Sequence, residues 1–272
     1  MSTLPVTLSI AGSDNSAGAG IQADLKTMTA LGTYAVTAIT CVVAEVPGKV
    51  IAIQPIEPHI VAEQVRLLFE AFPIAAAKTG MLYSREIIAA VADVLDAHSV
   101  PLVVDPVMVA TSGDSLLRDN AVALYRERLF PRATLVTPNL DEVGALLGRP
   151  VTDLAGMRRA GADLVAQFGV PFLIKGGHLR EAIATDLLVD RDGVTEFSAP
   201  FVPGVSTHGT GCTYAAAIAA GLGKGLALRE AVAEAKVFLT RAVTKFLRWE
   251  RPQGPTDALH HFADLERVNS ES

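Results

Sequence analysis

Apolar runs and amphipathic segments alternate along most of the chain, and this alternation predicts strands followed by helices. Short continuous apolar stretches such as 101–104 are typical of buried strands in a parallel sheet. The segments between them carry apolar residues three and four positions apart, which is helical spacing. Two runs at 184–190 and 194–199 flank the turn 191–193 and predict a hairpin. The pattern favours an α/β fold with a central, mainly parallel sheet and helices on both faces.

The individual elements follow from the same pattern. Strands are predicted at 5–11, 34–45, 49–56, 74–78, 101–104, 135–137, 172–175, 184–190 and 194–199. Helices are predicted at 21–31, around 61–68, after Ser84 as N-cap, near 119–129, at 153–168, within 204–225 and along an apolar stripe from 228 to 246. No internal repeat or linker interrupts this order, so we predict one domain over 1–272.

The bulk composition indicates a protein with a large buried core. Half of the 272 residues are apolar and 19% are charged, which excludes a disordered chain. The net charge is −6 and no basic cluster occurs, which argues against a nucleic-acid-binding surface. Cys41 and Cys212 are too few for a disulfide framework and indicate a reducing compartment.

The sequence also carries no evident signal for export or membrane insertion. Its N-terminus lacks the basic start and apolar core of a signal peptide. The longest uncharged run, between Lys26 and Glu45, contains Gly32 and five threonines, so it is a poor membrane span. We therefore expect a cytoplasmic protein without membrane contact.

The stretch 204–225 is the strongest candidate for chemistry. It predicts a glycine-rich turn, with Gly209 and Gly211, followed by an alanine-rich helix. The free N–H groups and partial positive charge of a helix start bind anions, and glycines let the backbone approach them. Cys212 lies in the first turn, where this field is expected to lower its thiol pKa. The alternative is an ordinary turn with a buried cysteine.

Polar residues also cluster where several predicted strands end. Asp105, Asn139, Glu142 and Lys175 lie at or just after such ends. Ligands of open α/β sheets bind at the carboxyl ends of strands. Asp105 and Glu142 are candidates for Mg²⁺ binding, and Lys175 for phosphate binding. With the 209–212 turn to stabilise a transferring group, these parts suit phosphoryl transfer, although no P-loop sequence is present.

Each of these residues also has a purely structural interpretation. Asp105 precedes Pro106, a pairing that suits a turn. Glu142 suits the first turn of a helix, and Lys175 suits a solvated strand end. Their occurrence together at strand ends of one sheet favours the functional interpretation.

Three other motifs are weaker. Residues 18–23 match the dinucleotide-binding fingerprint, with Glu45 as a ribose ligand, but several residues separate them from the strand. His208 lies four residues before Cys212, but this spacing alone does not make a Cys–His catalytic pair. The histidine pair 260–261 lacks an evident third metal ligand and is predicted to lie on the surface.

A series of longer motifs runs in order over nearly the whole chain. They are Ala11-Gly12-Ser13-Asp14 with Gly18-Ala19-Gly20-Ile21-Gln22-Ala23-Asp24-Leu25-Lys26-Thr27, Lys78-Thr79-Gly80-Met81, Val104-Asp105-Pro106-Val107-Met108, Thr137-Pro138-Asn139-Leu140-Asp141-Glu142, Lys175-Gly176-Gly177-His178 and His208-Gly209-Thr210-Gly211-Cys212-Thr213. Together they resemble the hydroxymethylpyrimidine and phosphomethylpyrimidine kinases of thiamine biosynthesis.

The resemblance implies a ribokinase-like kinase domain over 1–272 that uses ATP and Mg²⁺. It implies phosphorylation of 4-amino-5-hydroxymethyl-2-methylpyrimidine and then of its monophosphate. The residues implied to line the pyrimidine pocket are Gly12, Asp24, Val43, Glu45, Met81 and Val107. Those implied for ATP are Asn139, Lys175 and Thr210, and those for the metal are Asp105 and Glu142. Those implied for catalysis are Gly209, Thr210, Gly211, Lys175 and Cys212, with Cys212 in the place of the general base.

Two departures from the family pattern affect the expected substrate. Glu45 stands where many members have Gln. A carboxylate only accepts hydrogen bonds, so Glu45 favours a protonated ring nitrogen unless it is itself protonated. Ala110, followed by 111–114, stands where related pyridoxal-phosphorylating members can have Cys, which favours the pyrimidine branch. A pyridoxal kinase and a non-catalytic ligand sensor of the same fold stay open as alternatives.

The resemblance also implies a homo-oligomer, with a dimer as the expected state. Residues 110–118, which are rich in Gly, Ser and Asp beside the expected metal site, are the predicted lid. The expected partner is a small-molecule substrate rather than a nucleic acid or a membrane.

Overall fold

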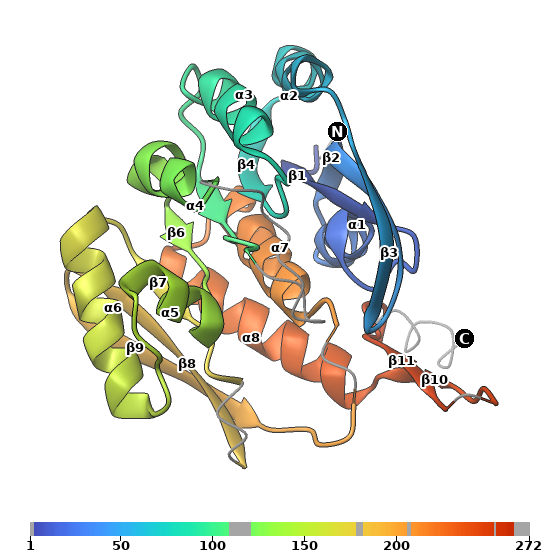
Figure 1. Cartoon of the computed structure of the whole chain (residues 1–272), viewed down its shortest axis with the longest axis vertical. Helices are drawn as coiled ribbons and strands as arrows, with labels where there is room; N and C mark the ends of the chain where they lie inside the picture. The colour runs from blue at the N-terminus through green and yellow to red at the C-terminus, as the bar shows by residue number, and fades with distance from the viewer. Residues whose placement is uncertain (1–2, 109–120, 178–181, 206–207, 253, 264–272) are drawn as a thin grey trace.

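The computed structural model describes residues 3–108, 121–177, 182–205, 208–252 and 254–263. Within them, nine strands form one sheet in the order β3-β2-β1-β4-β5-β6-β7-β8-β9 (Figure 1). The strands from β2 to β7 in this order are parallel. β3 pairs antiparallel at one edge, and the β8–β9 hairpin is added antiparallel at the other. The predicted fold class is therefore confirmed.

The strands agree closely with the apolar runs of the sequence. Their bounds are β1 Val6–Asp14, β2 Tyr34–Val46, β3 Lys49–Pro55, β4 Ile74–Thr79, β5 Leu102–Val104, β6 Leu135–Val136, β7 Phe172–Ile174, β8 Ile183–Asp190 and β9 Gly193–Pro200. The first strand runs to Asp14 rather than ending at residue 11, because it continues to pair with β2 beyond an irregularity after Ala11. This extension carries Ser13 and Asp14 to the edge where ligands are expected to bind.

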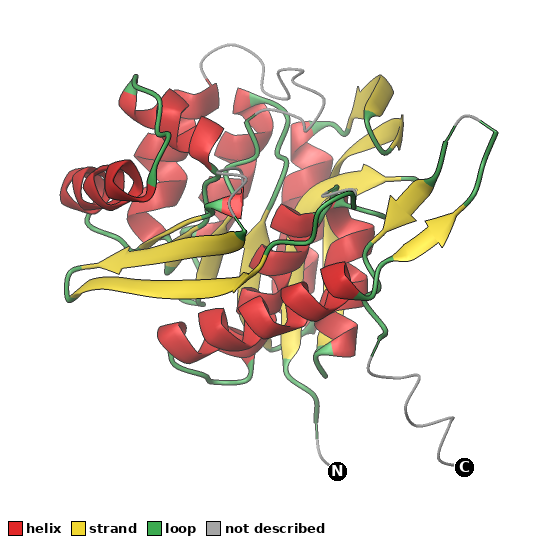
Figure 2. Ribbon diagram, turned by 90° about the horizontal axis from the view of Figure 1, so that it is seen from below, coloured by secondary structure: helices red, strands yellow, loops and turns green. Residues whose placement is uncertain are grey.

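Helices cover both faces of the sheet (Figures 1 and 2). Their bounds are α1 Gly20–Ala30, α2 Pro58–Ala71, α3 Arg85–Leu95, α4 Ala121–Leu124, α5 Leu140–Leu147, α6 Leu154–Phe168, α7 Thr210–Gly223 and α8 Leu228–Thr244. Ser84 caps α3 as predicted, since its hydroxyl accepts a hydrogen bond from the Ile87 N–H at 3.3 Å. Asp153 caps α6 in the same way by accepting a hydrogen bond from the Gly156 N–H.

The two hydrophobic cores lie on opposite faces because successive residues of a strand point in opposite directions. In β5, Leu102 and Val104 join the core beneath α2 to α6, whereas Val103 joins the core beneath α1, α7 and α8. α7 is buried along most of its length, from Thr213 to Leu222, so small alanines dominate where it packs on the sheet and on α8.

Four segments differ from the sequence prediction, and the first is the helix α5, which was not among the predicted elements. Residues 121–132 form the short α4, then a π-helical turn at Tyr125–Leu129 and a 3₁₀ turn at Phe130–Arg132 that contains Pro131, instead of one helix. α8 ends at Thr244, so Phe246 lies outside it. A separate hairpin of β10 Leu247–Trp249 and β11 Thr256–Ala258 was not predicted, because strands of three residues are too short to give a periodic pattern.

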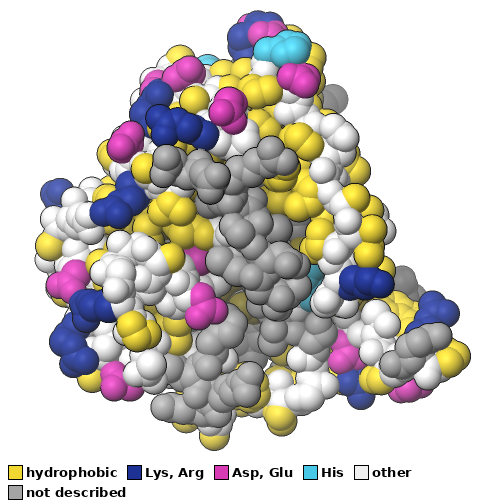
Figure 3. Space-filling model, in the orientation of Figure 1, with side chains coloured by type: hydrophobic (Ala, Val, Ile, Leu, Met, Phe, Trp, Pro, Cys, Tyr) yellow, Lys and Arg dark blue, Asp and Glu magenta, His cyan; other side chains and the backbone are white. Residues whose placement is uncertain are grey.

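Among the described residues, no helix is both long enough and apolar enough to span a membrane. The face shown in Figure 3 carries Lys and Arg side chains close to Asp and Glu side chains around its periphery. The predicted lid at 110–118 and the departure at Ala110 lie outside the described residues.

Candidate functional site

A cavity of about 300 Å³ lies at the carboxyl ends of the parallel strands. Residues from the ends of β1, β5, β6 and β7 meet there with the start of α7, the β2–β3 turn, the β8–β9 hairpin and α8. The position agrees with the expectation for open α/β sheets, because the loops after neighbouring parallel strands meet at one edge.

The glycine-rich turn before α7 forms one wall of this cavity. Gly209 has a φ of 82°, and a Cβ there would lie 1.8 Å from the carbonyl oxygen of Gly18, so only glycine fits. A Cβ at Gly211 would lie 3.2 Å from Nζ of Lys175 and 3.7 Å from Oδ2 of Asp105. The backbone of the turn thus lies directly over this lysine and aspartate.

Lys175 and Asp105 form an ion pair inside the cavity. Nζ of Lys175 donates to Oδ1 of Asp105 at 2.9 Å, and the Thr137 hydroxyl donates to the same oxygen at 3.0 Å. Burial acts to lower the pKa of Lys175, but the charges of Asp105 and Glu142 outweigh it and the pKa is raised. Lys175 is therefore a fixed cation next to the helix start, rather than the solvated strand end considered above.

Glu142 is held by a capping box at the start of α5. Its Oε2 accepts from the Asn139 N–H at 2.8 Å, while the Asn139 side chain accepts from the Glu142 N–H at 2.9 Å. Oε1 lies 3.4 Å from the Met108 nitrogen, which donates to it. Burial raises the pKa of Glu142 to about 7, with Lys175 opposing this and Asp105 adding to it. The structural interpretation of Glu142 as a first-turn acid thus also applies.

The two buried carboxylates fit a magnesium site of the kind that retains water ligands. Asp105 and Glu142 both line the cavity, and Asp105 directs Oδ2 toward Gly211. Mg²⁺ commonly takes one or two carboxylates together with phosphate oxygens and several waters. Because both oxygens of Glu142 already accept N–H donors, Glu142 is better suited to bind through a water than directly.

Cys212 lies in the first turn of α7 and lines the cavity, where it is partly accessible. Burial raises the pKa of its thiol to about 11, although the positive charge of Lys78 opposes this. The expected lowering of this pKa is therefore wrong. The reason is that removing a thiolate from water costs more here than the helix start and the lysine return.

The cavity brings together most of the residues predicted for the pyrimidine pocket, although their role in binding stays a prediction. Those that line it are Gly12, Val43, Glu45, Met81 and Val107. Asn139, Thr210 and the other residues predicted for ATP and catalysis line it as well.

Asp24 is the exception, since it is fully buried and is not among the cavity residues. Its Oδ2 accepts from Nζ of Lys78 at 2.7 Å and from the Ser9 hydroxyl at 2.5 Å. Both side chains of the Lys78–Asp24 pair have no exposed surface. Burial acts to lower the pKa of Lys78, but Asp24, Cys212 and Asp105 together raise it. Burial raises the pKa of Asp24, and the charge of Lys78 opposes this. Asp24 therefore supports the site from behind instead of facing a ligand.

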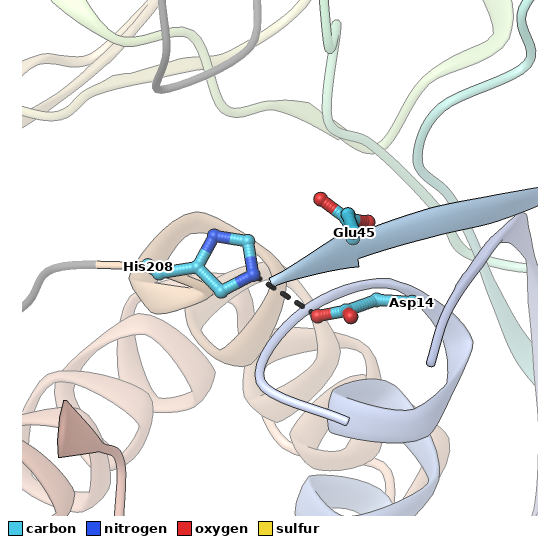
Figure 4. Close-up of side chains that lie close together, drawn as sticks. All are labelled: Asp14, Glu45 and His208. Atoms are coloured by element: carbon cyan, nitrogen blue, oxygen red, sulfur yellow. Dashed lines mark hydrogen bonds and ion pairs between the residues drawn. The ribbon is translucent and has the colours of Figure 1, made fainter. Parts of the chain in front are cut away.

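Figure 4 shows a cluster that the sequence did not reveal, in which His208 meets Asp14 and Glu45. His208 Nε2 lies 3.0 Å from Asp14 Oδ2, and this hydrogen bond raises the pKa of His208. Asp14 also accepts from the N–H groups of Ser16, Gly18 and Ala19. Burial acts to raise the pKa of Asp14, but these bonds lower it well below its usual range.

The cluster acts as a clamp between the loop after β1 and the turn before α7. Because the oxygens of Asp14 already accept four donors, they are poorly placed to bind a metal ion as well. His208 is bonded to Asp14, which does not support a Cys–His pair with Cys212. Asp14 lies among turn-forming residues, and both Asp14 and His208 belong to the motifs quoted above, but neither signal indicated that the two side chains meet.

The surface location predicted for the 260–261 histidine pair is wrong for His261. This residue is 4% exposed, and its Nε2 lies 3.0 Å from the hydroxyl of Thr213 on α7. Burial lowers the pKa of His261 to about 4, so the ring is neutral at neutral pH. The segment after β11 therefore packs beneath the start of α7, where it contacts Thr213, the residue that follows Cys212.

The far end of the cavity was also missed. It is lined by apolar residues of β9, the loop after it and α8, together with a buried charged pair, Asp186 and Lys236. The apolar members are Ala199, Pro200, Phe201, Val202, Leu239 and Val243. An apolar slot of this kind, next to a glycine-rich turn at a helix start, suits a flat heteroaromatic ring.

Comparison with known proteins places this geometry in context. A family model described as phosphomethylpyrimidine kinase matches residues 14–257. The hydroxymethylpyrimidine/phosphomethylpyrimidine kinase of Rhizobium meliloti is 46% identical over 258 residues, which cover 94% of this chain and 97% of that protein. Among solved structures, a pyridoxal kinase of Bacillus subtilis in an ADP complex aligns with a TM-score of 0.87 and 32% identity, covering 98% and 100% of the two chains. A phosphomethylpyrimidine kinase of Clostridium difficile aligns with a TM-score of 0.77 and 36% identity, covering 88% and 99%.

Proposed function

The chain belongs to the phosphomethylpyrimidine kinase family, and we propose that it phosphorylates 4-amino-5-hydroxymethyl-2-methylpyrimidine and then its monophosphate, with ATP, in thiamine biosynthesis. The observation that carries this proposal is the Lys175–Asp105 pair lying under the 209–212 turn inside one cavity. The homo-oligomeric state and the cytoplasmic location stay predictions.

Phosphoryl transfer needs stabilisation of charge on the transferring group more than it needs covalent chemistry from the protein. The N–H groups at the start of α7 and the Lys175 ammonium converge on the same part of the cavity. They would bind the oxygens of the terminal phosphate and hold it in place. Asp105 keeps Lys175 charged and aimed at this position.

Mg²⁺ bound with ATP would neutralise charge on the phosphate oxygens. Asp105 would hold it through the oxygen facing Gly211, and Glu142 would hold it through water. A carboxyl group with a pKa near 7 is partly protonated at neutral pH, and a nearby divalent cation favours its ionised form. Asn139 would support this arrangement because its backbone and side chain fix Glu142.

Cys212 is the group in this cavity placed to take the proton of a substrate hydroxyl. Attack by an alcohol benefits from proton removal, whereas a substrate phosphate is already ionised and needs no base. A thiol with a pKa of about 11 is ionised in only about one molecule in 10⁴ at pH 7, but its thiolate is a strong base. The first phosphorylation should therefore depend on Cys212, and the second should not.

The substrate ring is expected to lie at the opposite end from the apolar slot, between Met81, Val43 and Glu45. Burial and the charge of Asp14 raise the pKa of Glu45, while His208 opposes them. Glu45 can accept hydrogen bonds from the exocyclic amine and a protonated ring nitrogen of the aminopyrimidine.

A pyridoxal kinase is the second candidate, favoured by the structural alignment with the Bacillus subtilis enzyme of that name. The test is a mass-spectrometric product assay with Mg·ATP in which the pyrimidine alcohol, its monophosphate and pyridoxal are offered separately. Mono- and diphosphate from the pyrimidine with slow pyridoxal turnover would support the proposal. Rapid pyridoxal phosphorylation without pyrimidine diphosphate would overturn it, and nucleotide binding without turnover of any substrate would indicate a sensor.

A further inference from the structure

Asp186 on β8 and Lys236 on α8 form a buried ion pair that the chemistry above does not use. Nζ of Lys236 donates to Oδ2 of Asp186 at 2.7 Å and to the Ala184 carbonyl at 3.0 Å. The Lys236 side chain is 10% exposed and the Asp186 side chain is 5% exposed. Both residues line the cavity, at the apolar end.

The other oxygen of Asp186 reaches the backbone next to Lys175. Oδ1 of Asp186 accepts a hydrogen bond from the Gly176 N–H at 2.9 Å. A Cβ at Gly176 would lie 2.0 Å from the Thr185 carbonyl oxygen, so this backbone packs directly on β8. The pair therefore connects α8, through β8, to the backbone at 175–177.

The 175–177 segment is held from its other side by β6. The Lys175 N–H donates to the Pro138 carbonyl at 3.0 Å, and Lys175 forms an isolated parallel bridge with Asn139. With Asp186 on the opposite side, two consecutive backbone N–H groups are fixed by two different segments, the residues after β6 and the strand β8. The direction in which the Lys175 side chain leaves the backbone is set between these anchors.

Stability alone does not account for the pair. Replacing a buried ion pair by apolar residues of similar volume is often neutral or stabilising, because two charges no longer have to be removed from water. An apolar pair could still join α8 to β8, but it could not accept the Gly176 N–H. The hydrogen bond from Gly176 requires a carboxylate or an amide at 186, and it is charge-assisted in the native chain. Asp186 also interacts with the buried Tyr214 hydroxyl, and both double variants remove the negative charge that faces it.

We propose that Asp186 and Lys236 are positioning residues that hold the 175–177 segment so that the Lys175 ammonium stays on Asp105 beneath the 209–212 turn. Lys236 orients the Asp186 carboxylate through Oδ2, and Asp186 fixes Gly176 through Oδ1. The same face of α8 presents Leu239 and Val243 to the cavity, so the residues around the apolar slot and the phosphate-binding lysine share one rigid connection. The inference rests on the proposed function for the role of Lys175, but the placement of the segment can be measured without it.

The test compares two double variants that remove both charges. Asp186→Asn with Lys236→Met keeps an acceptor for the Gly176 N–H, whereas Asp186→Leu with Lys236→Met does not. Single variants are avoided because each leaves one buried charge unpaired and destabilises the fold. The control is Asp190→Asn with Arg229→Met, which removes an exposed ion pair between the same two elements, with N–O 3.1 Å, that does not reach 175–177.

Amide hydrogen exchange of the Gly176 N–H in the nucleotide-free protein is the first readout. We expect exchange about 10-fold or more faster in the Leu variant than in the Asn variant, with equal thermal unfolding midpoints. The second readout is the Kd of Mg·AMP-PCP by calorimetry, and the third is phosphorylation. We expect kcat/KM for ATP to fall about 10- to 100-fold in the Leu variant only, since small displacements of a catalytic group have effects of this size.

The inference is overturned if the two double variants have the same Gly176 exchange rate and the same kcat/KM for ATP, whether these values match the wild type or are changed equally. The control variant is expected to have the wild-type exchange rate and kcat/KM. A lower kcat/KM in the control would also count against the inference, because it would show that breaking any contact between α8 and β8 is enough. Failure of the wild type to phosphorylate any pyrimidine would count against the proposed function alone, because the exchange and nucleotide-binding comparisons do not use that substrate.

Discussion

Two lysine–aspartate pairs lie near Cys212 of the 209–212 turn, and they differ in what can reach them. Lys78 on β4 is bonded to Asp24 with no exposed surface on either side chain. Lys175 after β7 is bonded to Asp105 at nearly the same distance, but 15% of its side chain is exposed in the cavity. Both lysines have a raised pKa, because the paired carboxylate and other nearby charges together outweigh the opposing effect of burial.

The comparison shows that a buried charge contributes to chemistry only where a ligand can replace part of its lost solvation. The sealed region, which includes Lys78, Asp24 and His261, can stabilise the fold and the field around the site. In the open region, which includes Lys175, Asp105 and Cys212, a bound substrate can replace some of the contacts that these side chains make in the cavity. Changes in the sealed region should therefore alter stability first, and changes in the open region should alter turnover first.

The largest effect is expected for Cys212→Ala in the open region. The first phosphorylation should slow by about 10²–10⁴-fold, because a general base is lost, while the second should change little. In the wild type, the first-step rate should rise with pH between 7 and 9, since a thiol with a pKa of about 11 must lose its proton to act as a base. Rates measured separately on the alcohol and on the monophosphate test this. Equal losses in both steps would leave Cys212 a role in shape or anion binding only.

The next effect concerns the sealed pair. Lys78→Met should destabilise the fold by about 3–5 kcal/mol, because it leaves the Asp24 carboxylate buried and unpaired. Lys78→Met with Asp24→Asn should recover most of this, since the asparagine still accepts from Ser9. Urea unfolding of the three proteins measures the difference. If the double variant is stable but loses turnover as strongly as Lys175→Met does, the sealed pair acts in catalysis and the comparison fails.

Lys175→Met, in the open region, should lower turnover more than it lowers stability. Loss of a donor to the transferring phosphate is expected to lower kcat by about 10²–10³-fold, or about 3–4 kcal/mol. The free energy of unfolding should change less than in Lys78→Met, because water can enter the cavity and solvate Asp105. Steady-state kinetics and urea unfolding on the same preparations measure the change in kcat and the change in the free energy of unfolding. A collapse in stability with normal kcat in the remaining folded protein would reverse the assignment.

The smallest of these effects is a pH dependence of stability through His261. Its pKa is about 4 in the folded protein against 6.5 for an ordinary histidine, so protons bind preferentially to the unfolded state. This contribution is complete above pH 6.5 and is lost as the pH falls toward 4. At 1.36 kcal/mol for each pKa unit, it amounts to about 3 kcal/mol. The difference between unfolding curves of the wild type and His261→Gln, from pH 4 to 7, should show it, and identical curves would exclude it.

The sequence allowed the sheet and most of the open region to be predicted. Each buried strand is a continuous apolar run, and each run ends in polar residues such as Asp105 or Lys175. In a parallel sheet these ends must meet at one edge, so the cluster follows from the topology alone. Glu142 was identified in the same way, together with its second role as a helix-capping acid.

The sealed region could not be predicted, because its contacts depend on which distant segments meet. Asp24 is hydrogen-bonded to Lys78, which lies 54 positions later in the chain, and Thr213 is hydrogen-bonded to His261, which lies 48 positions later. Nothing near Asp24 in the sequence distinguishes a residue facing a pocket from one facing a buried lysine. The predicted lowering of the Cys212 pKa was wrong for a related reason. A helix start in the sequence indicates the electric field at the thiol, but it does not indicate how far water is excluded from the thiol.

The clamp between the first and last thirds of the chain has a consequence for how the protein is made. His208 must bond to Asp14, 194 positions earlier, and Gly209 must pack on Gly18 before the 209–212 turn is complete. At about 5–20 residues per second of synthesis, the earlier half of this contact waits roughly 10 to 40 s for its partner to be made. During that interval the growing chain lacks the completed turn and cannot yet catalyse the reaction. Activity therefore depends on the synthesis of residues 208 and 209, however early the strands of the sheet are made.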